Sequence, residues 1–325
     1  MQSEELRDAL FAPDTIARLE QIVDLDRRVV DDDGDARSRA ALAEAEILIT
    51  SWGAPRIDAA FLKQMPRLRA VIHSAGTVKH WAGPELWEQG IVVSSAATAN
   101  AQPVAEYTLA MILLAGKRVL WPEAPSIGAA LAAGWHPLQD AGNFGRTVGI
   151  VGASRTGRLV MDLLTGFDVN IVVYDPYLSD EDVAAWGTRT SSLEALAEQV
   201  DVLSVHAPAL PSTRHMVNAQ VLSLMQDGAV LINTARGSLV DHEALVAELD
   251  RRPLYAVLDV TAPEPLPSDH PLRSHPQVLL TPHIAGSVGN ELRRLGEYAV
   301  CEVERLVAGS ELLNQIRWSD LPTSA

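Results

Sequence analysis

Three side chains that can act together on one small molecule, Arg236, Glu264 and His283, each follow an apolar run in the second half of the chain. A guanidinium keeps its charge and offers a planar fork of donors, so Arg236 can bind a carboxylate and polarise a neighbouring carbonyl. An imidazole exchanges protons near neutral pH, so His283 can protonate that carbonyl oxygen. A carboxylate beside the imidazole orients it and favours its charged form, which is the role we expect of Glu264. The set predicts the proton-transfer half of a keto-acid reduction.

Taken one at a time, these residues also have purely structural interpretations. Arg236 can form a surface ion pair, and His283 can be an ordinary loop histidine. Ligands of open α/β sheets bind beyond the carboxyl ends of the strands. The shared position after strand-like runs therefore favours the catalytic interpretation.

A turn of the type that binds dinucleotides follows an earlier apolar run. Gly152 allows the tight bend, and Gly157 allows the next helix to pack closely against the strand. Ser154 stands where a second glycine usually lets the backbone approach the pyrophosphate, so the motif is weaker there. We assign Arg155 and Thr156 to the same site, because the N-terminus of a helix binds phosphate groups.

An acidic residue, Asp175, follows the next apolar run, 23 residues after Gly152. A carboxylate at this place accepts hydrogen bonds from the adenosine ribose and repels a 2′-phosphate, so it favours NAD over NADP. An ordinary Asp-Pro turn is the alternative, since Pro176 comes next. Strand, turn, helix, strand and acid together predict dinucleotide binding, and the cofactor would supply the hydride.

The elements that must position these residues form two series. Short apolar runs alternate with helical patterns, which predicts βαβ units and mainly parallel sheets. Ser191 and Glu194 predict a capping box, and residues 291–308 predict an amphipathic helix. The first series contains three strands and the second contains six, at residues 46–50, 69–73 and 91–94, and at residues 147–151, 170–174, 202–205, 229–233, 255–260 and 278–281.

Composition excludes several classes of protein. A length of 325 residues suits two domains, and a net charge of −16 disfavours nucleic acid and anionic lipid as partners. The single cysteine, Cys301, excludes a disulfide framework, and the acidic segment 31–35 lacks the spacing of a calcium loop and predicts a solvated turn. The N-terminus lacks the pattern of a signal peptide, and residues 107–116 are too few to span a membrane. We expect a cytoplasmic protein without a metal or a membrane partner.

With these residues and motifs, the chain resembles the D-isomer-specific 2-hydroxyacid dehydrogenases from about Leu68 to Gly286. The resemblance is strongest in residues 203–208 (LSVHAP), 231–241 (LINTARGSLVD), 258–265 and 280–286 (LTPHIAG). It implies that Arg236, Glu264 and His283 are the catalytic set and that NAD (NADH) is the cofactor. The cofactor-binding residues it implies, together with those of the turn, are Gly152, Ser154, Arg155, Thr156, Gly157, Asp175, His206, Ala207, Pro208, Thr213, Thr234, Ala235, Asp259 and Gly286.

The resemblance also implies a fold of class α/β. A Rossmann-type doubly wound parallel sheet, residues 101–285, would be inserted into a smaller flavodoxin-like α/β substrate domain. Residues 1–100 and the closing helix in residues 286–325 would form that domain. Residues 100–114 resemble the helix that helps family members to form a homodimer.

The substrate-binding segment departs from the family pattern. Residues 76–81 read GTVKHW where the family usually has Gly-Val-Gly followed by other side chains, and Thr261 replaces the usual aromatic residue after Asp259. Substrate preference is therefore not transferable. We expect substrate to bind at Trp52, Ser74, Ala75, Gly76, Thr77 and Val78, with Trp52 equally compatible with a core position.

We expect an enzyme that interconverts a small 2-keto acid and its D-2-hydroxy acid. An NAD(H)-sensing binding protein of the same fold, similar to a co-repressor, is the alternative from another class. Phosphoglycerate oxidation is a weaker version, because the chain ends soon after the closing helix and no basic cluster lies near residues 50–52. A formate-oxidising relative would lack the acid at Glu264.

Overall fold

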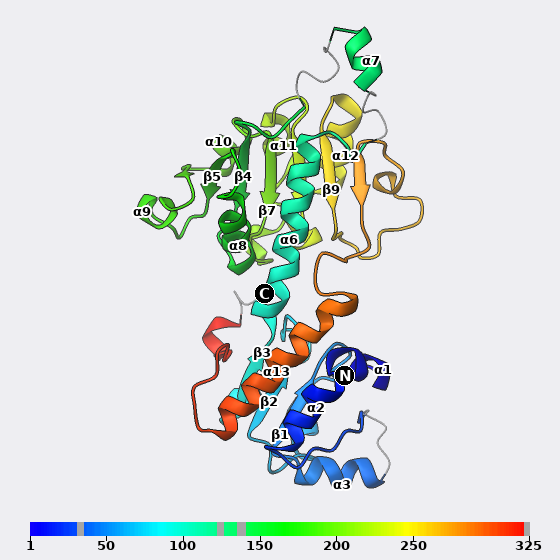
Figure 1. Ribbon diagram of the computed structural model, residues 1–325, viewed down its shortest axis with the longest axis vertical. Helices are drawn as coiled ribbons and strands as arrows, with labels where there is room; N and C mark the ends of the chain where they lie inside the picture. Colours follow the sequence, from blue (N-terminus) through cyan, green and yellow to red (C-terminus); the bar gives the residue numbers. More distant parts are fainter. Residues whose placement is uncertain (31–35, 122–126, 135–140, 322–325) are drawn as a thin grey trace. The chain divides into compact units, whose positions relative to one another are not determined.

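The computed structural model describes residues 1–30, 36–121, 127–134 and 141–321, so the acidic segment 31–35 lies outside the described residues. The chain divides into two compact units (Figure 1). Unit 1 comprises Met1–Ala101 and Ser287–Ala325, and unit 2 comprises Gln102–Gly286. Unit 1 is therefore built from both ends of the chain.

Unit 2 contains a parallel sheet of seven strands in the order β10-β9-β8-β7-β4-β5-β6. It confirms the predicted doubly wound sheet and its six strands. The sequence missed β6 because this edge strand has only two residues, both polar. The chain order reverses between β4 and β7, where such sheets bind ligands. The strands are β4 (Thr147–Val151), β5 (Asn170–Tyr174), β6 (Thr188–Arg189), β7 (Val202–Val205), β8 (Val230–Asn233), β9 (Tyr255–Leu258) and β10 (Val278–Leu280).

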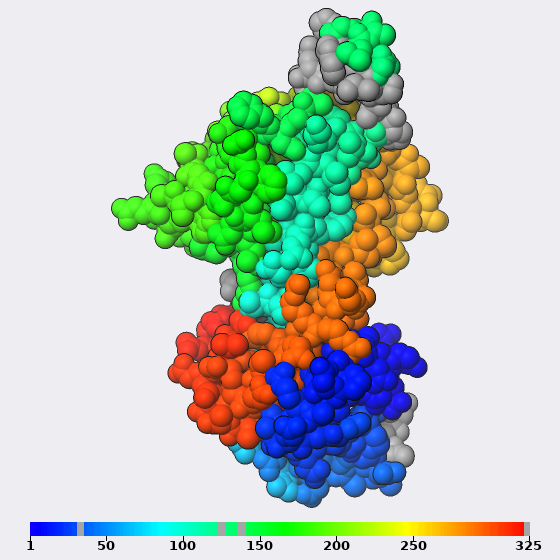
Figure 2. Space-filling view, viewed as in Figure 1, coloured from blue at the N-terminus to red at the C-terminus, as the bar shows by residue number. Residues whose placement is uncertain are grey.

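Helices cover both faces of this sheet, because alternate strand residues enter different cores. Val148, Ile150 and Val173 pack with residues of α6 and α8, whereas Leu203 and Leu231 pack with residues of α10, α11 and α12. The part of α6 that belongs to unit 2 lies at the surface in Figure 2. The helices are α6 (Ala97–Gly116), α7 (Ile127–Ala132), α8 (Arg155–Leu164), α9 (Asp180–Val183), α10 (Leu193–Ala197), α11 (Ala219–Leu224) and α12 (His242–Arg251).

The predicted cap of α10 was wrong by one residue. Ser192, not Ser191, is the N-cap, and its hydroxyl accepts a hydrogen bond from the backbone N–H of Ala195. Starting at Leu193 puts Leu193 and Leu196 into the core. Burial of these two leucines sets the helix start, which the spacing of serine and glutamate alone did not reveal.

Unit 1 contains a parallel sheet of three strands, β1 (Ile47–Thr50), β2 (Ala70–His73) and β3 (Val92–Ser95), which confirms the smaller predicted sheet. Its last long helix, α13 (Leu292–Val307), was predicted as residues 291–308 and buries Leu295, Ala299 and Val303. A cavity of about 1060 Å³ borders the outer edge of β1. The remaining helices are α1 (Glu4–Leu10), α2 (Pro13–Glu20), α3 (Ala36–Glu44), α4 (Ala59–Leu62) and α5 (Glu85–Glu88).

Two features are absent from the described residues. Within the ranges given above, no helix is long and apolar enough to cross a membrane. In the same part of the chain, no group of three or more His, Cys, Asp or Glu side chains is arranged to hold a metal ion.

Candidate active site

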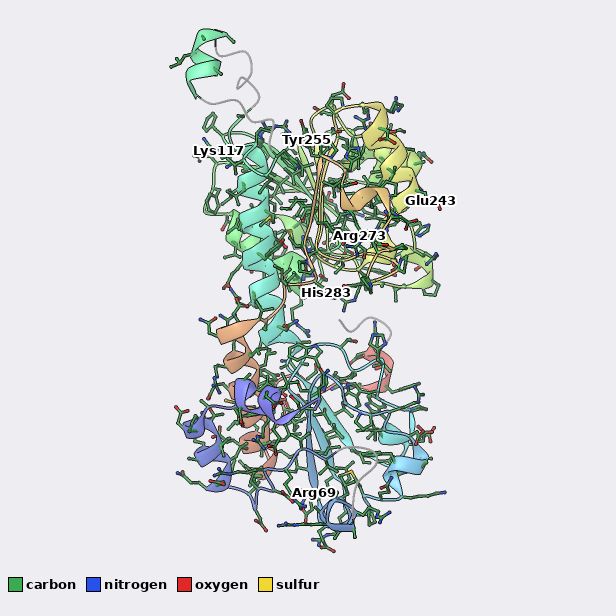
Figure 3. All side chains as sticks on the ribbon, turned by 90° about the vertical axis from the view of Figure 1, so that its right-hand side faces the viewer. Arg69, Lys117, Glu243, Tyr255, Arg273 and His283 are labelled. Atoms are coloured by element: carbon green, nitrogen blue, oxygen red, sulfur yellow. The ribbon has the colours of Figure 1, made fainter. Side chains whose placement is uncertain are left out.

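The three predicted catalytic side chains lie in loops that follow neighbouring parallel strands, β8, β9 and β10. His283 and Glu264 meet directly, since Nδ1 of the imidazole lies 2.7 Å from Oε1 of the carboxylate. Both side chains are half exposed, at 51% and 40%. Figure 3 shows His283 at the end of the unit 2 sheet opposite to Tyr255, which begins β9. This end of the sheet therefore presents a paired, accessible imidazole.

The loop that carries Arg236 is held on both sides by Asn233, the last residue of β8. The Asn233 side chain accepts a hydrogen bond from the backbone N–H of Ala235 at 3.0 Å and donates one to the carbonyl of Arg236 at 2.9 Å. A Cβ on Gly237 would lie 2.0 Å from the carbonyl carbon of Thr261, so only glycine lets this loop pack against the loop of Glu264. Asn233 and Gly237 thus fix the conformation of the loop that contains the exposed Arg236.

Electrostatics link Arg236 to Glu264. The surrounding protein lowers the pKa of Arg236, and the negative charge of Glu264 opposes this fall. The guanidinium donates a hydrogen bond to the carbonyl of Ala235 at 2.6 Å. Its remaining donors can bind a carboxylate, because a guanidinium has five N–H groups.

The loop that carries His283 is organised by the buried carboxylate of Asp259, which is 1% exposed. Oδ1 accepts hydrogen bonds from the hydroxyl of Thr281 at 2.6 Å and from the backbone N–H of Ile284 at 2.8 Å. Oδ2 accepts one from the backbone N–H of Ala285 at 2.9 Å. The sequence predicted Asp259 as a cofactor contact, and the structure gives it the additional role of shaping this loop.

His283 itself adopts a left-handed backbone conformation, with φ at 57°. Residues other than glycine rarely do so, although histidine, asparagine and aspartate are enriched among the exceptions. Its backbone N–H points to the carbonyl oxygens of Asp259 and Thr281, both at 3.0 Å. The network around Asp259 therefore determines where the imidazole lies.

The predicted dinucleotide turn has the geometry that its residues suggest. Gly152 has φ at 90°, and a Cβ there would lie 2.7 Å from Cα of Ala207. A Cβ on Gly157 would lie 2.3 Å from the carbonyl oxygen of Gly152. Ser154 has φ at −60° and caps α8, its hydroxyl accepting a hydrogen bond from the backbone N–H of Gly157 at 3.3 Å. The position of Ser154 does not require glycine, so the serine is no flaw in the turn.

Asp175 and His206 flank this turn. Asp175 accepts hydrogen bonds from the backbone N–H groups of Ala153 at 2.8 Å and Tyr177 at 2.9 Å, which leaves lone pairs for a ribose hydroxyl. His206 follows β7, and its Nε2 lies 2.8 Å from the hydroxyl of Ser204. Burial lowers the pKa of His206 to about 4, so the imidazole is neutral near pH 7.

The remaining predicted cofactor residues follow the same strands. Thr213 closes its own loop by donating to the carbonyl of Pro208 at 2.6 Å. Thr234 lies 2.8 Å, oxygen to oxygen, from Thr108 on α6. Arg155 is exposed at the start of α8, whereas Thr156 and Gly286 are partly buried.

These residues fit a dinucleotide. The turn at Gly152 would not accept a side chain, and the N-terminus of α8 lies beside it, which is the arrangement that binds a pyrophosphate. Nδ1 of His206 is buried without a hydrogen-bond partner among the described residues, next to this turn. A polar ligand at the turn would satisfy such an atom.

The predicted substrate segment follows β2 in unit 1. Ser74 is buried and its hydroxyl donates to the carbonyl of Thr50 at 2.8 Å, so that hydroxyl is used structurally. The Val78 side chain packs in the core. Within the described part of the chain, the backbone N–H groups of Gly76, Thr77 and Val78 donate no hydrogen bond. Three successive free N–H groups can bind an anion.

Trp52 is 40% exposed, so the structure excludes the core interpretation of this residue. Ala75 is fully buried and contributes no exposed side chain to this segment. Trp52 therefore offers an accessible ring close in sequence to β1.

Sequence reasoning missed three residues that organise the catalytic loops: Asn233, Thr281 and Tyr107. The Tyr107 hydroxyl lies 2.9 Å from that of Thr281. Asn233 is fully buried at a strand end, and a polar residue in that place was a usable signal. Tyr107 sits in an apolar helix, and its partner is 174 residues away in the sequence. No local pattern reveals such a contact.

Comparison with known proteins places the chain in a family. The sequence profile described as "D-isomer specific 2-hydroxyacid dehydrogenase, NAD binding domain" matches residues 126–285. The chain is 34% identical to a glyoxylate reductase of Aeropyrum pernix over 275 residues, which cover 82% of this chain and 80% of the relative.

Two further proteins show how far the similarity extends. A D-3-phosphoglycerate dehydrogenase of Mycobacterium tuberculosis is 33% identical over 303 residues, and these cover 92% of this chain but 56% of the relative. The chain thus spans little more than half the length of this relative. The chain is also similar to the TT0316 protein from Thermus thermophilus, whose crystal structure superposes with a TM-score of 0.69. The two sequences are 32% identical, and the match covers 94% of this chain and 96% of the TT0316 chain.

Proposed function

Because the chain belongs to the D-isomer specific 2-hydroxyacid dehydrogenase family, we propose that it interconverts a small 2-keto acid and its D-2-hydroxy acid with NAD as the cofactor. The observation that carries the proposal is the contact of 2.7 Å between His283 and Glu264 in loops beside that of Arg236. The guanidinium of Arg236 suits the carboxylate and carbonyl of a 2-keto acid, and the imidazole paired with Glu264 suits the proton that the reduction consumes.

The three residues have different roles in the proposed reduction. Arg236 binds the substrate carboxylate and polarises its carbonyl. His283 donates a proton to the carbonyl oxygen from Nε2, because Glu264 holds Nδ1. The carboxylate of Glu264 stabilises the charged imidazole before the transfer. Bound NADH would supply the hydride for the carbonyl carbon, and the product would then be a hydroxy acid.

We propose that the free N–H groups of Gly76, Thr77 and Val78 also contact the substrate, as the sequence predicted. Asp175 supports NAD over NADP, because its carboxylate at the end of β5 would repel a 2′-phosphate. With NADPH in place of NADH, we expect kcat/KM to fall by at least tenfold.

A keto-acid screen tests the proposal. Purified protein and NADH are mixed with glyoxylate, hydroxypyruvate, pyruvate, phenylpyruvate and 3-phosphohydroxypyruvate, and the loss of NADH absorbance is followed. The phosphorylated substrate is included because the mycobacterial relative is a D-3-phosphoglycerate dehydrogenase. Turnover of one or more of these acids supports the proposal. Tight NADH binding without turnover of any of them would contradict it and favour an NAD(H)-sensing protein.

A further inference from the structure

Two neighbouring polar residues of α6, Tyr107 and Thr108, each contact a different catalytic loop. The Tyr107 hydroxyl lies 2.9 Å from that of Thr281, in the loop of His283. The Thr108 hydroxyl lies 2.8 Å from that of Thr234, in the loop of Arg236. Thr108 is fully buried. One turn of one helix therefore contacts both loops.

The direction of each hydrogen bond in the first contact follows from counting protons. Thr281 has one hydroxyl proton and donates it to Oδ1 of Asp259 at 2.6 Å. Thr281 can then only accept from Tyr107, so the chain runs from Tyr107 through Thr281 to Asp259. Among the described residues, the phenol of Tyr107 is the one group that donates a hydrogen bond to the Thr281 hydroxyl.

The second contact runs the opposite way. Thr108 donates its proton to the backbone carbonyl of Val104 at 2.7 Å. It must therefore accept from the hydroxyl of Thr234, two residues before Arg236. Each contact therefore has a defined donor and acceptor, and each joins α6 to one residue of a catalytic loop.

We propose that Tyr107 and Thr108 are positioning residues that set the spacing between His283 and Arg236. This inference rests on the proposed function, since it names what aligns the two groups for proton transfer and carboxylate binding. Tyr107 acts through Thr281 and Asp259, which hold the left-handed backbone of His283. Thr108 acts through Thr234, next to Asn233, whose side chain holds the loop of Arg236.

The two contacts predict different kinetic effects. Tyr107→Phe removes one hydrogen bond from the His283 loop, so kcat should fall about tenfold with little change in the KM for the keto acid. Thr108→Val removes the anchor of the Arg236 loop, so the KM for the keto acid should rise about tenfold. The Kd for NADH should change less than these kinetic constants in both variants. A purely structural role would change kcat, KM and Kd together.

Matched controls separate positioning from general damage. Tyr255→Phe removes a phenol hydroxyl at the opposite end of the sheet (Figure 3). Thr165→Val removes an exposed hydroxyl just after α8, which donates to the backbone carbonyl of Asp162. Both controls should match the unaltered protein. Thr281→Val should lower kcat at least as much as Tyr107→Phe, whereas Thr281→Ser keeps the hydroxyl and should restore it.

A measurement without turnover distinguishes failure of this inference from failure of the proposed function. With 15N-histidine labelling, the His283 ring signals should shift in Tyr107→Phe while those of His73 stay in place. If the unaltered protein reduces no keto acid, the proposed function fails, and the His283 signals still test the positioning role. Unchanged kcat and unchanged His283 signals in Tyr107→Phe would overturn the inference. An equal loss of NADH binding would also overturn it.

Discussion

His73 and His283 occupy comparable places in the two units, yet their surroundings are opposite. His73 is the last residue of β2 and is 3% exposed, with Nδ1 2.8 Å from the hydroxyl of Thr50 and its ring 4.9 Å from that of Trp81. His283 follows β10, has a side chain that is 51% exposed, and pairs with a carboxylate. Burial lowers the pKa of His73 to about 3.

The difference shows what makes a strand-end histidine suitable for chemistry. A neutral partner and an apolar environment keep the His73 imidazole uncharged, so it contributes packing and one hydrogen bond. His283 instead combines a charged partner with access to solvent, which are the surroundings that the proposed proton transfer requires. Position at the end of a parallel strand is shared by both and is not sufficient.

The largest effect that tests this comparison is expected from His283→Asn. Asparagine tolerates the left-handed backbone but cannot donate a titratable proton. General acid–base groups contribute about 10²- to 10⁴-fold, so kcat for the best keto acid should fall about 10³-fold. Stopped-flow measurement of NADH oxidation gives kcat, and thermal unfolding should show a Tm within a few degrees of the original.

The matched change His73→Asn should act mainly on stability. It removes a buried ring, and we expect a loss of about 1–3 kcal/mol in the free energy of unfolding, measured by urea titration. If His283→Asn keeps kcat within tenfold of the original, the contrast between the two histidines fails.

A second, smaller effect concerns the pH dependence of stability. His73 and His206 have pKa values of about 3 and about 4 when folded, below the ordinary value of 6.5. Below pH 6.5 the unfolded chain binds protons that the folded protein does not, so stability falls as the pH falls, towards pH 4 for His206 and pH 3 for His73. At pH 5 each histidine should cost about 2 kcal/mol relative to neutral pH.

Urea titrations at pH 7.5 and pH 5.0 measure this loss. His73→Gln and His206→Gln replace each imidazole with a group that does not titrate, so each variant should narrow the difference between the two pH values by about 2 kcal/mol. A difference that stays the same in both variants would show that other groups cause the acid sensitivity.

The smallest effect is expected in the dinucleotide turn. Ser154→Gly removes the cap of α8 and adds freedom to the unfolded chain, which should cost about 0.5–1 kcal/mol and leave the Kd for NADH unchanged. Gly152→Ala is the contrast, because its Cβ would collide with the backbone of Ala207. Calorimetry should show weaker NADH binding, that is a higher Kd, for Gly152→Ala and not for Ser154→Gly. A weaker Kd in Ser154→Gly would mean that the serine itself contacts the cofactor.

Sequence reasoning predicted those parts of the site that depend on local patterns. The apolar runs indicated the strands, and the polar residues after them indicated Arg236, Glu264 and His283, of which the last two are in contact. Residue spacing works here because the carboxyl ends of parallel strands meet at one edge of the sheet. The roles of these residues remain predictions.

The parts that depend on tertiary contacts could not be predicted. Tyr107 looks like one more aromatic residue of an apolar helix until its contact with Thr281 is seen. The motif has glycine at the position of Ser154, so residue type alone predicts a weaker turn. The backbone at Ser154 has a conformation that any residue can adopt, and its side chain caps α8. The start of α10 was off by one residue because burial of Leu193 decided it.

The discontinuous make-up of unit 1 has a consequence for the order in which the protein folds on the ribosome. Helix α13 supplies Leu295, Ala299 and Val303 to a core that also contains Leu10 and Ile72. Because translation proceeds from the N-terminus, residues 102–286 are complete before α13 emerges, and domains generally fold as units during synthesis. The first hundred residues must therefore wait, with part of their apolar surface uncovered, until the final segment arrives.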